Sequence, residues 1–439
     1  MERTLIKDLK TGKDILLKGW IYELRVLSKM AFILLRDSSG IVQGIIKDKE
    51  ILKKISGVSL ESVVEIKGKI KKANVKADFA RKDIEVEIID FEIINRAEKL
   101  PIHINEKTTT TALSKRLDYR FLDIRKPKVH AIFKIQSTIM QAYREFMINE
   151  GAMEVNFPSI ISASSEGGTE LYSLKYFEKK AFLSQSCQLY KQMLACAVEK
   201  VFTIFTVWRA EKHNTLRHLN EARQLDFEMA FADEFEVMDV MAKCVQHIVK
   251  KVLEKNKEEL ELLNVDLKIP KVKYLTFEKA NELLKKNKIK TEKKDLTGEG
   301  EKKLGELFPD TIVFVHDWPI EGKPFYILPK QGQESLLASS KIGQSKEKNL
   351  SHGFDAIYQG MEITSGGQRV HIPEILEKQL RNKKLNPKDF KTYIDSFRFG
   401  APPHAGWGIG LERLTMLILG IENIREVVLF PRDRERLTP

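Results

Sequence analysis

The hydrophobic pattern changes at about residue 95, and this change constrains the fold more than any other feature of the sequence. Before it, β-branched residues are concentrated in five short segments, several of which alternate apolar with polar positions. These segments are 14–24, 31–37, 41–47, 62–71 and 84–94. Turn residues such as Asp37–Gly40 separate them, and a short helix is expected at about 48–56. Five strands with a helix in that position predict an OB-fold barrel over residues 1–95, a module that often binds single-stranded nucleic acid.

The remainder of the chain predicts a different kind of domain. Residues 96–112 have little apolar periodicity, and residues 96–126 are expected to form a hinge or linker. An amphipathic helix is expected from Pro127 to Asn149, with the proline in its first turn. After it, strands and helices mix without regular βαβ alternation, which predicts an α+β domain over 127–439 built on an antiparallel sheet. A peripheral insertion is expected at about 255–350, and its lysine-rich part, to residue 305, is expected to be helical.

Composition limits the class of protein. Lys+Arg 74 against Asp+Glu 62 gives a net charge of +12, which suits a polyanionic partner but equally fits a lysine-rich solvated surface. Met1–Asp14 lacks the apolar core of a signal peptide, and runs such as 201–208 are far shorter than the ~20 residues that span a membrane. The three cysteines lack a CxxC spacing: Cys187, Cys196 and Cys244. A cytoplasmic protein without a membrane partner is expected.

A basic loop between two apolar segments is the first candidate for chemistry. The segment ending at Trp208 runs into a polar loop that contains Arg209 and Arg217, and the chain returns through 225–231. Guanidinium groups match phosphate oxygens in geometry and charge, so this strand–loop–strand could hold a triphosphate. Taken alone, the same pattern fits a surface hairpin with solvated charges.

Two further clusters lie towards the C-terminus. Glycines at 406, 408 and 410 precede Arg413, so backbone could approach a ligand and the following helix could present the arginine to an anion. The alternative is a tight glycine turn that packs a helix onto a sheet. Asp355 and Glu362, seven residues apart beside a turn, could share Mg²⁺ held by a triphosphate, or could simply be solvated.

Together these segments resemble the three motifs of class II aminoacyl-tRNA synthetases. Arg209-Ala210-Glu211 with Arg217-His218-Leu219 resembles motif 2, and Gly410-Leu411-Glu412-Arg413 resembles motif 3. The helix 127–149 followed by Pro158 resembles motif 1, the dimer-forming element. An N-terminal OB-like domain is typical of the subgroup for aspartate, asparagine and lysine. The resemblance implies an enzyme that uses ATP and Mg²⁺ to attach an amino acid to tRNA, and that forms a homodimer.

The segment Ser184–Gln192 is similar to the QSPQLYKQ stretch of aspartyl-tRNA synthetases of the archaeal and eukaryotic type. In those enzymes the lysine at the position of Lys191 faces the substrate carboxylate, whereas asparaginyl enzymes carry an uncharged residue there. Lys191 and Arg369 would form a fork for the β-carboxylate, and a neutral amide would leave two buried cations poorly compensated. The resemblance therefore implies an aspartate–tRNA ligase that charges tRNA(Asp), either alone or together with tRNA(Asn).

The same resemblance implies roles for individual residues. The residues implied for L-aspartate are Glu166, Gln188, Lys191, Arg209, Ser365 and Arg369. Those implied for ATP are Arg209, Glu211, Arg217, His218, Leu219, Glu362, Gly410, Leu411, Glu412 and Arg413, of which Arg209, Arg413 and Glu362 would carry the catalysis. Those implied for Mg²⁺ are Glu362, Ser365 and Asp355. Those implied for the anticodon are Arg25, Phe32 and Gln43, with Phe32 stacking on a base.

Some positions depart from the family pattern. Cys187 replaces a proline, and Ala222-Arg223 lie where an aromatic residue often borders the adenine, a place that Phe227 could take. The alternatives to an aspartyl enzyme are an asparaginyl or lysyl enzyme of the same subgroup, an amide-forming relative that makes asparagine, and a catalytically silent RNA-binding paralogue. The charge of Lys191 and Arg369 argues against the first, the anticodon domain against the second, and the retained catalytic set against the third.

Overall fold

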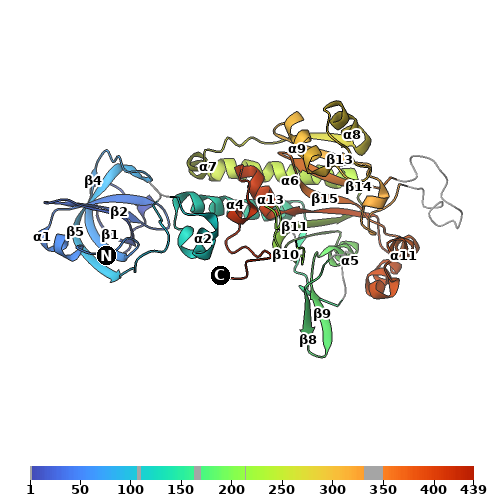
Figure 1. Cartoon of the computed structure of the whole chain (residues 1–439), viewed down its shortest axis with the longest axis horizontal. Helices are drawn as coiled ribbons and strands as arrows, with labels where there is room; N and C mark the ends of the chain where they lie inside the picture. Colours follow the sequence, from blue (N-terminus) through green and yellow to red (C-terminus); the bar gives the residue numbers. More distant parts are fainter. Residues whose placement is uncertain (1, 106–109, 163–169, 213, 331–349) are drawn as a thin grey trace. The chain divides into compact units, whose positions relative to one another are not determined.

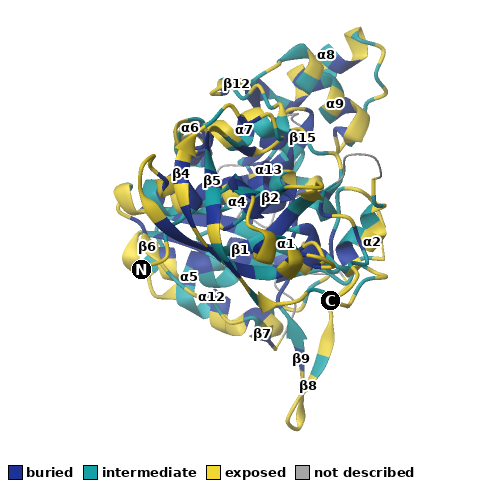
Figure 2. Ribbon diagram, turned by 90° about the vertical axis from the view of Figure 1, so that its left-hand side faces the viewer, coloured by how far each residue is buried: buried dark blue, intermediate teal, exposed yellow. Residues whose placement is uncertain are grey.

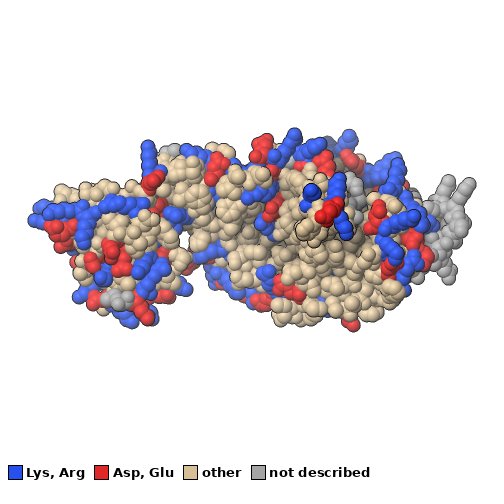
Figure 3. Space-filling view, turned by 90° about the horizontal axis from the view of Figure 1, so that it is seen from below, with Lys and Arg blue, Asp and Glu red and all other residues tan. Residues whose placement is uncertain are grey.

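The computed structural model describes residues 2–105, 110–162, 170–212, 214–330 and 350–439 (Figure 1). It divides into two compact units, one up to His130 with Pro439 and one from Ala131 to Thr438. Among the residues it describes, no helix has both the length and the apolar character needed to cross a membrane. On the face seen in Figure 3, basic side chains are interspersed with acidic ones on each unit, so the net positive charge forms no single patch there.

The first unit contains the predicted OB-fold, a closed barrel with strand order β1-β2-β3-β5-β4. Its strands are β1 (Asp14–Val26), β2 (Ala31–Arg36), β3 (Ile41–Ile46), β4 (Val63–Lys72) and β5 (Ala80–Asn95). Helix α1 (Lys49–Lys54) lies between β3 and β4, and the Asp48 carboxylate caps it by accepting hydrogen bonds from two backbone amides. The alternating apolar residues of all five strands fill the barrel, which is why the sequence pattern predicted it correctly.

Two short helices lie in the range expected as a linker, α2 (Leu113–Asp118) and α3 (Arg120–Asp123). Before them, Ile102 and Ile104 are buried against the outside of the barrel, in one cluster with Tyr22 and Leu34. The carboxylate of Glu61 pairs with Arg36 at 2.6 Å and with Arg125 at 2.9 Å. These contacts attach residues 100–125 to the barrel within the first unit.

The second unit is built on an eight-stranded, mainly antiparallel sheet, as predicted, with order β12-β13-β14-β15-β16-β11-β10-β6. Only β12–β13 and β10–β6 are parallel pairs among its described strands. The strands are β6 (Met153–Glu154), β10 (Lys200–Trp208), β11 (Glu221–Ala230), β12 (Lys271–Thr276), β13 (Thr311–His316), β14 (Gly353–Tyr358), β15 (Met361–Gln368) and β16 (His404–Gly410). Motif-like segments distant in sequence therefore become neighbouring strands.

Long helices cover one face of this sheet. Helix α4 (Pro127–Asn149) has the predicted bounds, and it packs with α6 (Glu234–Lys255) and α13 (Leu411–Leu419) in the main hydrophobic core. Leu225 and Phe227 of β11 point into this core. Because side chains alternate along a strand, Asp226 and Glu228 point to the opposite face, where the candidate site lies.

Residues 255–350 correct one expectation. The range contains the helices α7 (Lys257–Leu263), α8 (Phe277–Lys286) and α9 (Thr297–Leu307), but also the strands β12 and β13, so the part before residue 305 is not wholly helical. Strand β13 pairs with β14 in the main sheet. Leu284 and Leu304 form a second core with Val313 and Val315, while exposed residues line the outside of α8 (Figure 2). The lysines dominate the composition, but the few apolar residues decide the fold.

A small sheet and three helices complete the unit. Strands β7 (Ile160–Ile161), β9 (Lys179–Leu183) and β8 (Ser173–Tyr176) form a separate antiparallel sheet. Helix α5 (Gln188–Val198) follows it and packs with α11 (Pro373–Asn382) and α12 (Lys391–Arg398).

Candidate active site

A cavity of about 240 Å³ lies on the face of the sheet opposite α4 and α6. Strands β10, β11, β15 and β16 and the first turns of α5 and α13 contribute its walls. Most of the predicted site residues line it: Gln188, Lys191, Arg209, Glu211, Arg217, His218, Leu219, Glu362, Ser365, Arg369, Gly410, Glu412 and Arg413. Glu166 lies outside the described residues. Leu411 and Asp355 do not line the cavity.

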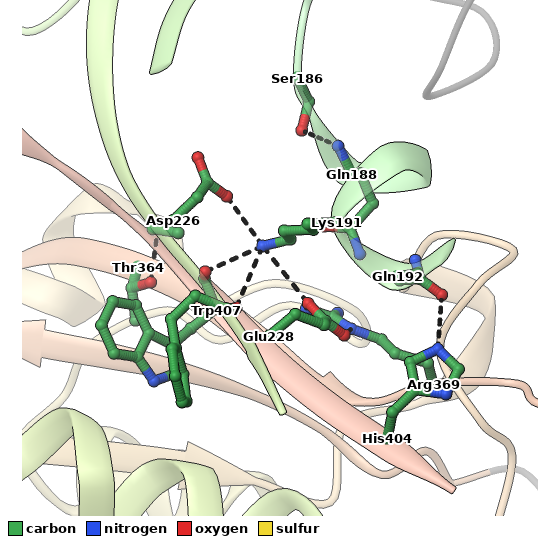
Figure 4. A network of polar contacts seen from close by, with 12 residues as sticks. Ser186, Gln188, Lys191, Gln192, Asp226, Glu228, Thr364, Arg369, His404 and Trp407 are labelled. Atoms are coloured by element: carbon green, nitrogen blue, oxygen red, sulfur yellow. Dashed lines mark hydrogen bonds and ion pairs between the residues drawn. The ribbon is translucent and has the colours of Figure 1, made fainter. Parts of the chain in front are cut away.

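Two carboxylates that the sequence analysis missed lie at one end of the cavity: Asp226 lines it, and the fully buried Glu228 contacts the lining residues Lys191 and Arg369. The Lys191 ammonium donates to Asp226 Oδ1 at 2.8 Å and to the Trp407 carbonyl at 2.9 Å, and it lies 3.5 Å from Glu228 Oε2 (Figure 4). The Arg369 guanidinium donates to Glu228 from Nε at 2.8 Å and from a terminal nitrogen at 3.2 Å. Two acids at alternate positions of the otherwise apolar segment 225–230 were the signal that could have revealed them.

These pairs keep the cations charged. Burial favours the neutral form of Lys191, but Asp226 and Glu228 outweigh it and raise the pKa of the ammonium. Glu228 is likewise buried, yet Arg369 and Lys191 hold its pKa below the usual value. Two cations therefore face two anions at this end of the cavity. The expectation that a neutral amide would leave the two buried cations poorly compensated is corrected, because Asp226 and Glu228 pair with both.

Glycines on β16 make room for the two acids. A Cβ atom at Gly406 would overlap the Glu228 carboxylate and the backbone carbonyl of Phe227, and one at Gly408 would lie 2.9 Å from Asp226 Oδ1. These glycines lie in an extended strand. Gly406 and Gly408 do not form a tight turn, and side chains of β11 fill the space that their missing Cβ atoms leave.

Two buried polar atoms in this end have no hydrogen-bond partner among the described residues. They are Oδ2 of Asp226, an acceptor, and Nε2 of Gln188, a donor. Both residues line the cavity. Buried polar atoms are normally paired, so an acceptor and a donor left here favour a ligand that carries both kinds of group.

The other end of the cavity is positively charged. Arg209 follows β10, Arg217 and His218 belong to the loop before β11, and Arg413 lies in the first turn of α13. The Arg413 guanidinium donates to the carbonyl of Glu362 at 3.2 Å. Three guanidinium groups from separate elements fit a polyanion such as a triphosphate.

Glu362, which is half-buried, places a carboxyl group beside these arginines. Burial, followed by repulsion from Asp355, raises the pKa of Glu362 to about 7. Its backbone amide donates to the Glu301 carboxylate of α9 at 3.1 Å, a contact from the lysine-rich range that the sequence analysis assigned no role. An excess of buried carboxylate fits a divalent cation. The described residues nevertheless bring no three His, Cys, Asp or Glu together as a metal cluster.

Four predicted residues make contacts that the sequence did not reveal. The two oxygens of Asp355 accept hydrogen bonds from the Lys323 ammonium at 2.8 and 2.7 Å. The buried Glu412 carboxylate accepts the backbone amide of Arg223 at 3.0 Å. Leu411 packs in the main core, and so does Phe227, which contacts Trp407 and does not border the cavity.

The three residues predicted for the anticodon lie on the barrel. Arg25 pairs with Phe32 across β1 and β2, and Phe32 is half-buried on the outer surface because its neighbours Ala31 and Ile33 point inwards. Gln43 of β3 pairs with Leu34, two residue pairs from Phe32, and donates to Glu85 at 3.2 Å. The outer surface of these strands therefore offers an aromatic ring, a guanidinium and an amide.

Comparison with known proteins agrees with this arrangement. Residues 112–434 match the family described as tRNA synthetases class II (D, K and N), and residues 15–94 match the OB-fold nucleic acid binding domain. The Aspartate--tRNA(Asp/Asn) ligase of Methanocaldococcus jannaschii is 42% identical, over 99% of this chain and 97% of the relative. The Aspartate--tRNA(Asp) ligase of Pyrococcus horikoshii is 43% identical, over 98% and 97%.

Among solved structures, the asparaginyl-tRNA synthetase from Pyrococcus horikoshii complexed with asparaginyl-adenylate is similar, with a TM-score of 0.90, 32% identity and complete coverage of both chains. The fold thus predicted from the sequence is confirmed, and the architecture is shared by enzymes named for different amino acids. The chain belongs to the class II tRNA synthetases for aspartate, lysine and asparagine.

Proposed function

We propose that the chain is an aspartate–tRNA ligase, which activates L-aspartate with ATP and transfers the aspartyl group to the 3′ end of tRNA(Asp). The observation that carries the proposal is the buried Lys191 beside Arg369 at one end of a cavity whose other end contains Arg209, Arg217 and Arg413. An acidic amino acid and a triphosphate fit these two ends. The relatives at 42% and 43% identity that are named aspartate–tRNA ligases support it.

Selectivity for aspartate follows from hydrogen-bond type. A β-carboxylate only accepts hydrogen bonds and can receive them from the Lys191 ammonium and the Arg369 guanidinium. The amide of asparagine has an NH2 group, which is a donor. It would either point this group at the donors of Lys191 and Arg369 or lose half of its contacts. A site built from charged donors rejects such an analogue strongly, even though Asp226 and Glu228 already balance the charges of Lys191 and Arg369. Gln188, whose amide nitrogen has no partner among the described residues, would hold the α-carboxylate. Glu166, which lies outside the described residues, would hold the α-ammonium group.

The first reaction needs no general base from the protein. The α-carboxylate of aspartate is already an anion and attacks the α-phosphorus of ATP in line, releasing pyrophosphate. Arg209 would bridge the two reacting groups, and Arg413 and Arg217 would neutralise the outer phosphates, so catalysis is positioning and charge stabilisation. Glu211, His218, Leu219 and Gly410 would complete the ATP site.

Mg²⁺ is expected as the cofactor. The raised pKa of Glu362 indicates a site that favours added positive charge, and Glu362 and Ser365, from one strand, would hold the ion together with phosphate oxygens. Asp355 is paired with Lys323, so it would not hold the ion directly, but its negative charge would favour the ion from a second layer of residues. The ion supplies further charge neutralisation on the triphosphate when bound.

In the second reaction, the terminal ribose hydroxyl of tRNA attacks the mixed anhydride and AMP leaves. The barrel would read the anticodon through Arg25, Phe32 and Gln43, whose outward placement suits unstacked bases.

A homodimer formed through the motif 1 helix, α4, is part of the proposal. So is the possibility of two tRNA partners, since one relative is named for tRNA(Asp/Asn) and another for tRNA(Asp).

Aminoacylation with labelled aspartate tests the proposal, with tRNA(Asp) and tRNA(Asn) assayed in parallel. Charging of tRNA(Asp) is the expected result. Charging of both would show an enzyme of broader tRNA specificity. A parallel assay with labelled asparagine in which only tRNA(Asn) is charged would instead show the activity for which the similar solved structure is named. Absence of charging, together with absence of aspartate-dependent pyrophosphate exchange, would contradict the proposal. An Arg209→Gln variant is the matched negative control.

A further inference from the structure

The loop that carries Arg217 and His218 is held from outside by the C-terminal end of the chain. Its residues 214–216 are exposed and form no regular secondary structure. Besides the bonds of Arg425, the C-terminal segment contacts the loop through hydrogen bonds from Asn220 N to Arg432 O at 2.8 Å, Ile424 N to Leu216 O at 2.9 Å, Asn214 Nδ2 to Glu435 Oε1 at 3.1 Å, and Arg434 to Lys212 O at 3.3 Å. A polar, exposed loop is thus held by a segment more than two hundred residues later.

Arg425 is the centre of these contacts. Its Nε donates to Asp433 Oδ2 at 2.6 Å, and its two terminal nitrogens donate to the Thr215 carbonyl at 3.0 Å and to Asn214 Oδ1 at 2.7 Å. The side chains of Arg425 and Asp433 are only 11% and 8% exposed. One planar guanidinium therefore joins the C-terminal segment to two successive loop residues.

Thr215 connects this contact to the cavity. Its hydroxyl lies 2.6 Å from His218 Nδ1 and accepts the backbone amide of Arg217 at 3.2 Å. Both Arg217 and His218 line the positively charged end of the cavity. A continuous series of hydrogen bonds runs from Asp433 through Arg425 and Thr215 to these two residues.

We propose that Arg425, oriented by Asp433, is a positioning residue for ATP binding: it fixes Thr215 and thereby holds Arg217 and His218 where they meet the triphosphate. The inference rests on the proposed function, because it concerns the nucleotide end of the same site. Pre-ordering a loop removes a cost that ligand binding would otherwise bear. Arg425 does not line the cavity, so it acts only through the loop.

The geometry requires arginine and not merely a positive charge. Three acceptors on two segments are met by three nitrogens of a rigid, planar group. The single ammonium of lysine cannot reach all three positions at once. Arg425→Lys is therefore expected to behave more like Arg425→Ala than like the wild type.

Aspartate-dependent pyrophosphate exchange by the full chain tests the proposal. Arg425→Ala is expected to raise KM for ATP about tenfold, the effect of losing charge-assisted hydrogen bonds, and to leave KM for aspartate within about twofold. Aspartate recognition is spared because Lys191 and Arg369 belong to other elements. Arg381→Ala is the matched control, since Arg381 pairs with Glu377 on the surface of α11 and should change neither constant.

A second single variant keeps the test decisive if Arg425→Ala folds poorly. Thr215→Val removes the hydroxyl that contacts His218 and Arg217 while leaving Arg425 intact, and it should also raise KM for ATP. Combined with Arg425→Ala it should add less than about twofold, because both changes break the same series.

An unchanged KM for ATP in both single variants, with only the active fraction reduced, would overturn the positioning role. Failure of the proposed function is distinguishable from this result, because the wild type itself would then show no aspartate-dependent exchange.

Discussion

The ammonium of Lys191 lies 2.8 Å from a carboxylate oxygen of Asp226, and both side chains are almost fully buried, at 2% and 3% exposure. Groups of the protein itself therefore meet the cost of burying the cation, and Asp226 holds the charged donor in position. This arrangement leads to the first prediction.

Lys191→Met should abolish aspartate activation and weaken the fold. We expect kcat/KM for aspartate in pyrophosphate exchange to fall at least about a hundredfold, because the donor for the β-carboxylate is lost. The free energy of unfolding should fall by about 3 kcal/mol, because Asp226 is left buried without its partner. Lys251→Met, at a surface pair with Glu145, is the control. Retained aspartate activity would exclude Lys191 from substrate recognition.

Glu301→Ala should impair the use of ATP although the residue lies on a helix of the lysine-rich range. Its carboxylate accepts the backbone amide of Glu362, so its loss should loosen the start of β15 and raise KM for Mg–ATP about threefold to tenfold. Pyrophosphate exchange at varied Mg–ATP measures this. Glu299→Ala, an exposed acid in the first turn of the same helix, should have no effect. Equal behaviour of the two variants would show that the contact has no role.

Gly406→Ala should destabilise the protein far more than Gly410→Ala. A methyl group at Gly406 overlaps the Glu228 carboxylate and a backbone carbonyl, whereas the nearest atom at Gly410 is 3.6 Å away. Overpacking against backbone and a buried ion pair costs about 3 kcal/mol, and the open position should cost under about 1 kcal/mol. Urea denaturation compares the two, and similar losses would contradict the assigned use of space on β16.

The stability of the protein should fall as pH decreases from 6.5 to 4. Burial lowers the pKa of His404 from 6.5 to about 4, although Glu228 acts in the opposite direction. The unfolded chain therefore binds a proton that the folded chain does not, so the contribution is complete above pH 6.5 and is lost progressively towards pH 4, by up to about 3 kcal/mol.

Denaturation at several pH values tests this dependence. His404→Gln should show a smaller slope of the free energy of unfolding between pH 6.5 and 4. His103→Gln, which changes an exposed histidine, should keep the wild-type slope. An identical slope in all three proteins would assign the pH dependence to other groups.

Phe32→Ala should affect tRNA and not amino-acid activation. Loss of one stacking ring costs about 1–3 kcal/mol, so KM for tRNA should rise about tenfold or more while pyrophosphate exchange stays unchanged. Phe79→Ala removes another exposed ring of the barrel and is the control. If both variants charge tRNA like the wild type, the anticodon surface lies elsewhere.

The sequence predicted those parts of the fold that local pattern encodes. The alternation of apolar residues specified the barrel strands, and the helical spacing around Ile135 and Ile139 specified α4. Motif residues such as Arg209 and Arg413 were predicted because they carry charge at a recognisable spacing, and the cavity brings them together.

What the sequence did not reveal depends on contacts between distant residues. Lys191 finds Asp226 and Arg369 finds Glu228 only when β11, β15 and α5 have assembled. The same holds for Gly406, whose missing side chain matters because of a neighbouring strand, and for Glu301, which is inconspicuous among charged residues. Local periodicity contains no information on such pairings.

The central claim is selectivity for aspartate, and the amino-acid dependence of pyrophosphate exchange tests it most directly. The wild-type chain would be assayed with aspartate and with asparagine under identical ATP and Mg²⁺. We predict a kcat/KM for aspartate more than about a thousandfold above that for asparagine. A carboxylate would accept hydrogen bonds from both Lys191 and Arg369, whereas the amide NH2 group of asparagine would not. Equal or higher kcat/KM with asparagine would contradict the account.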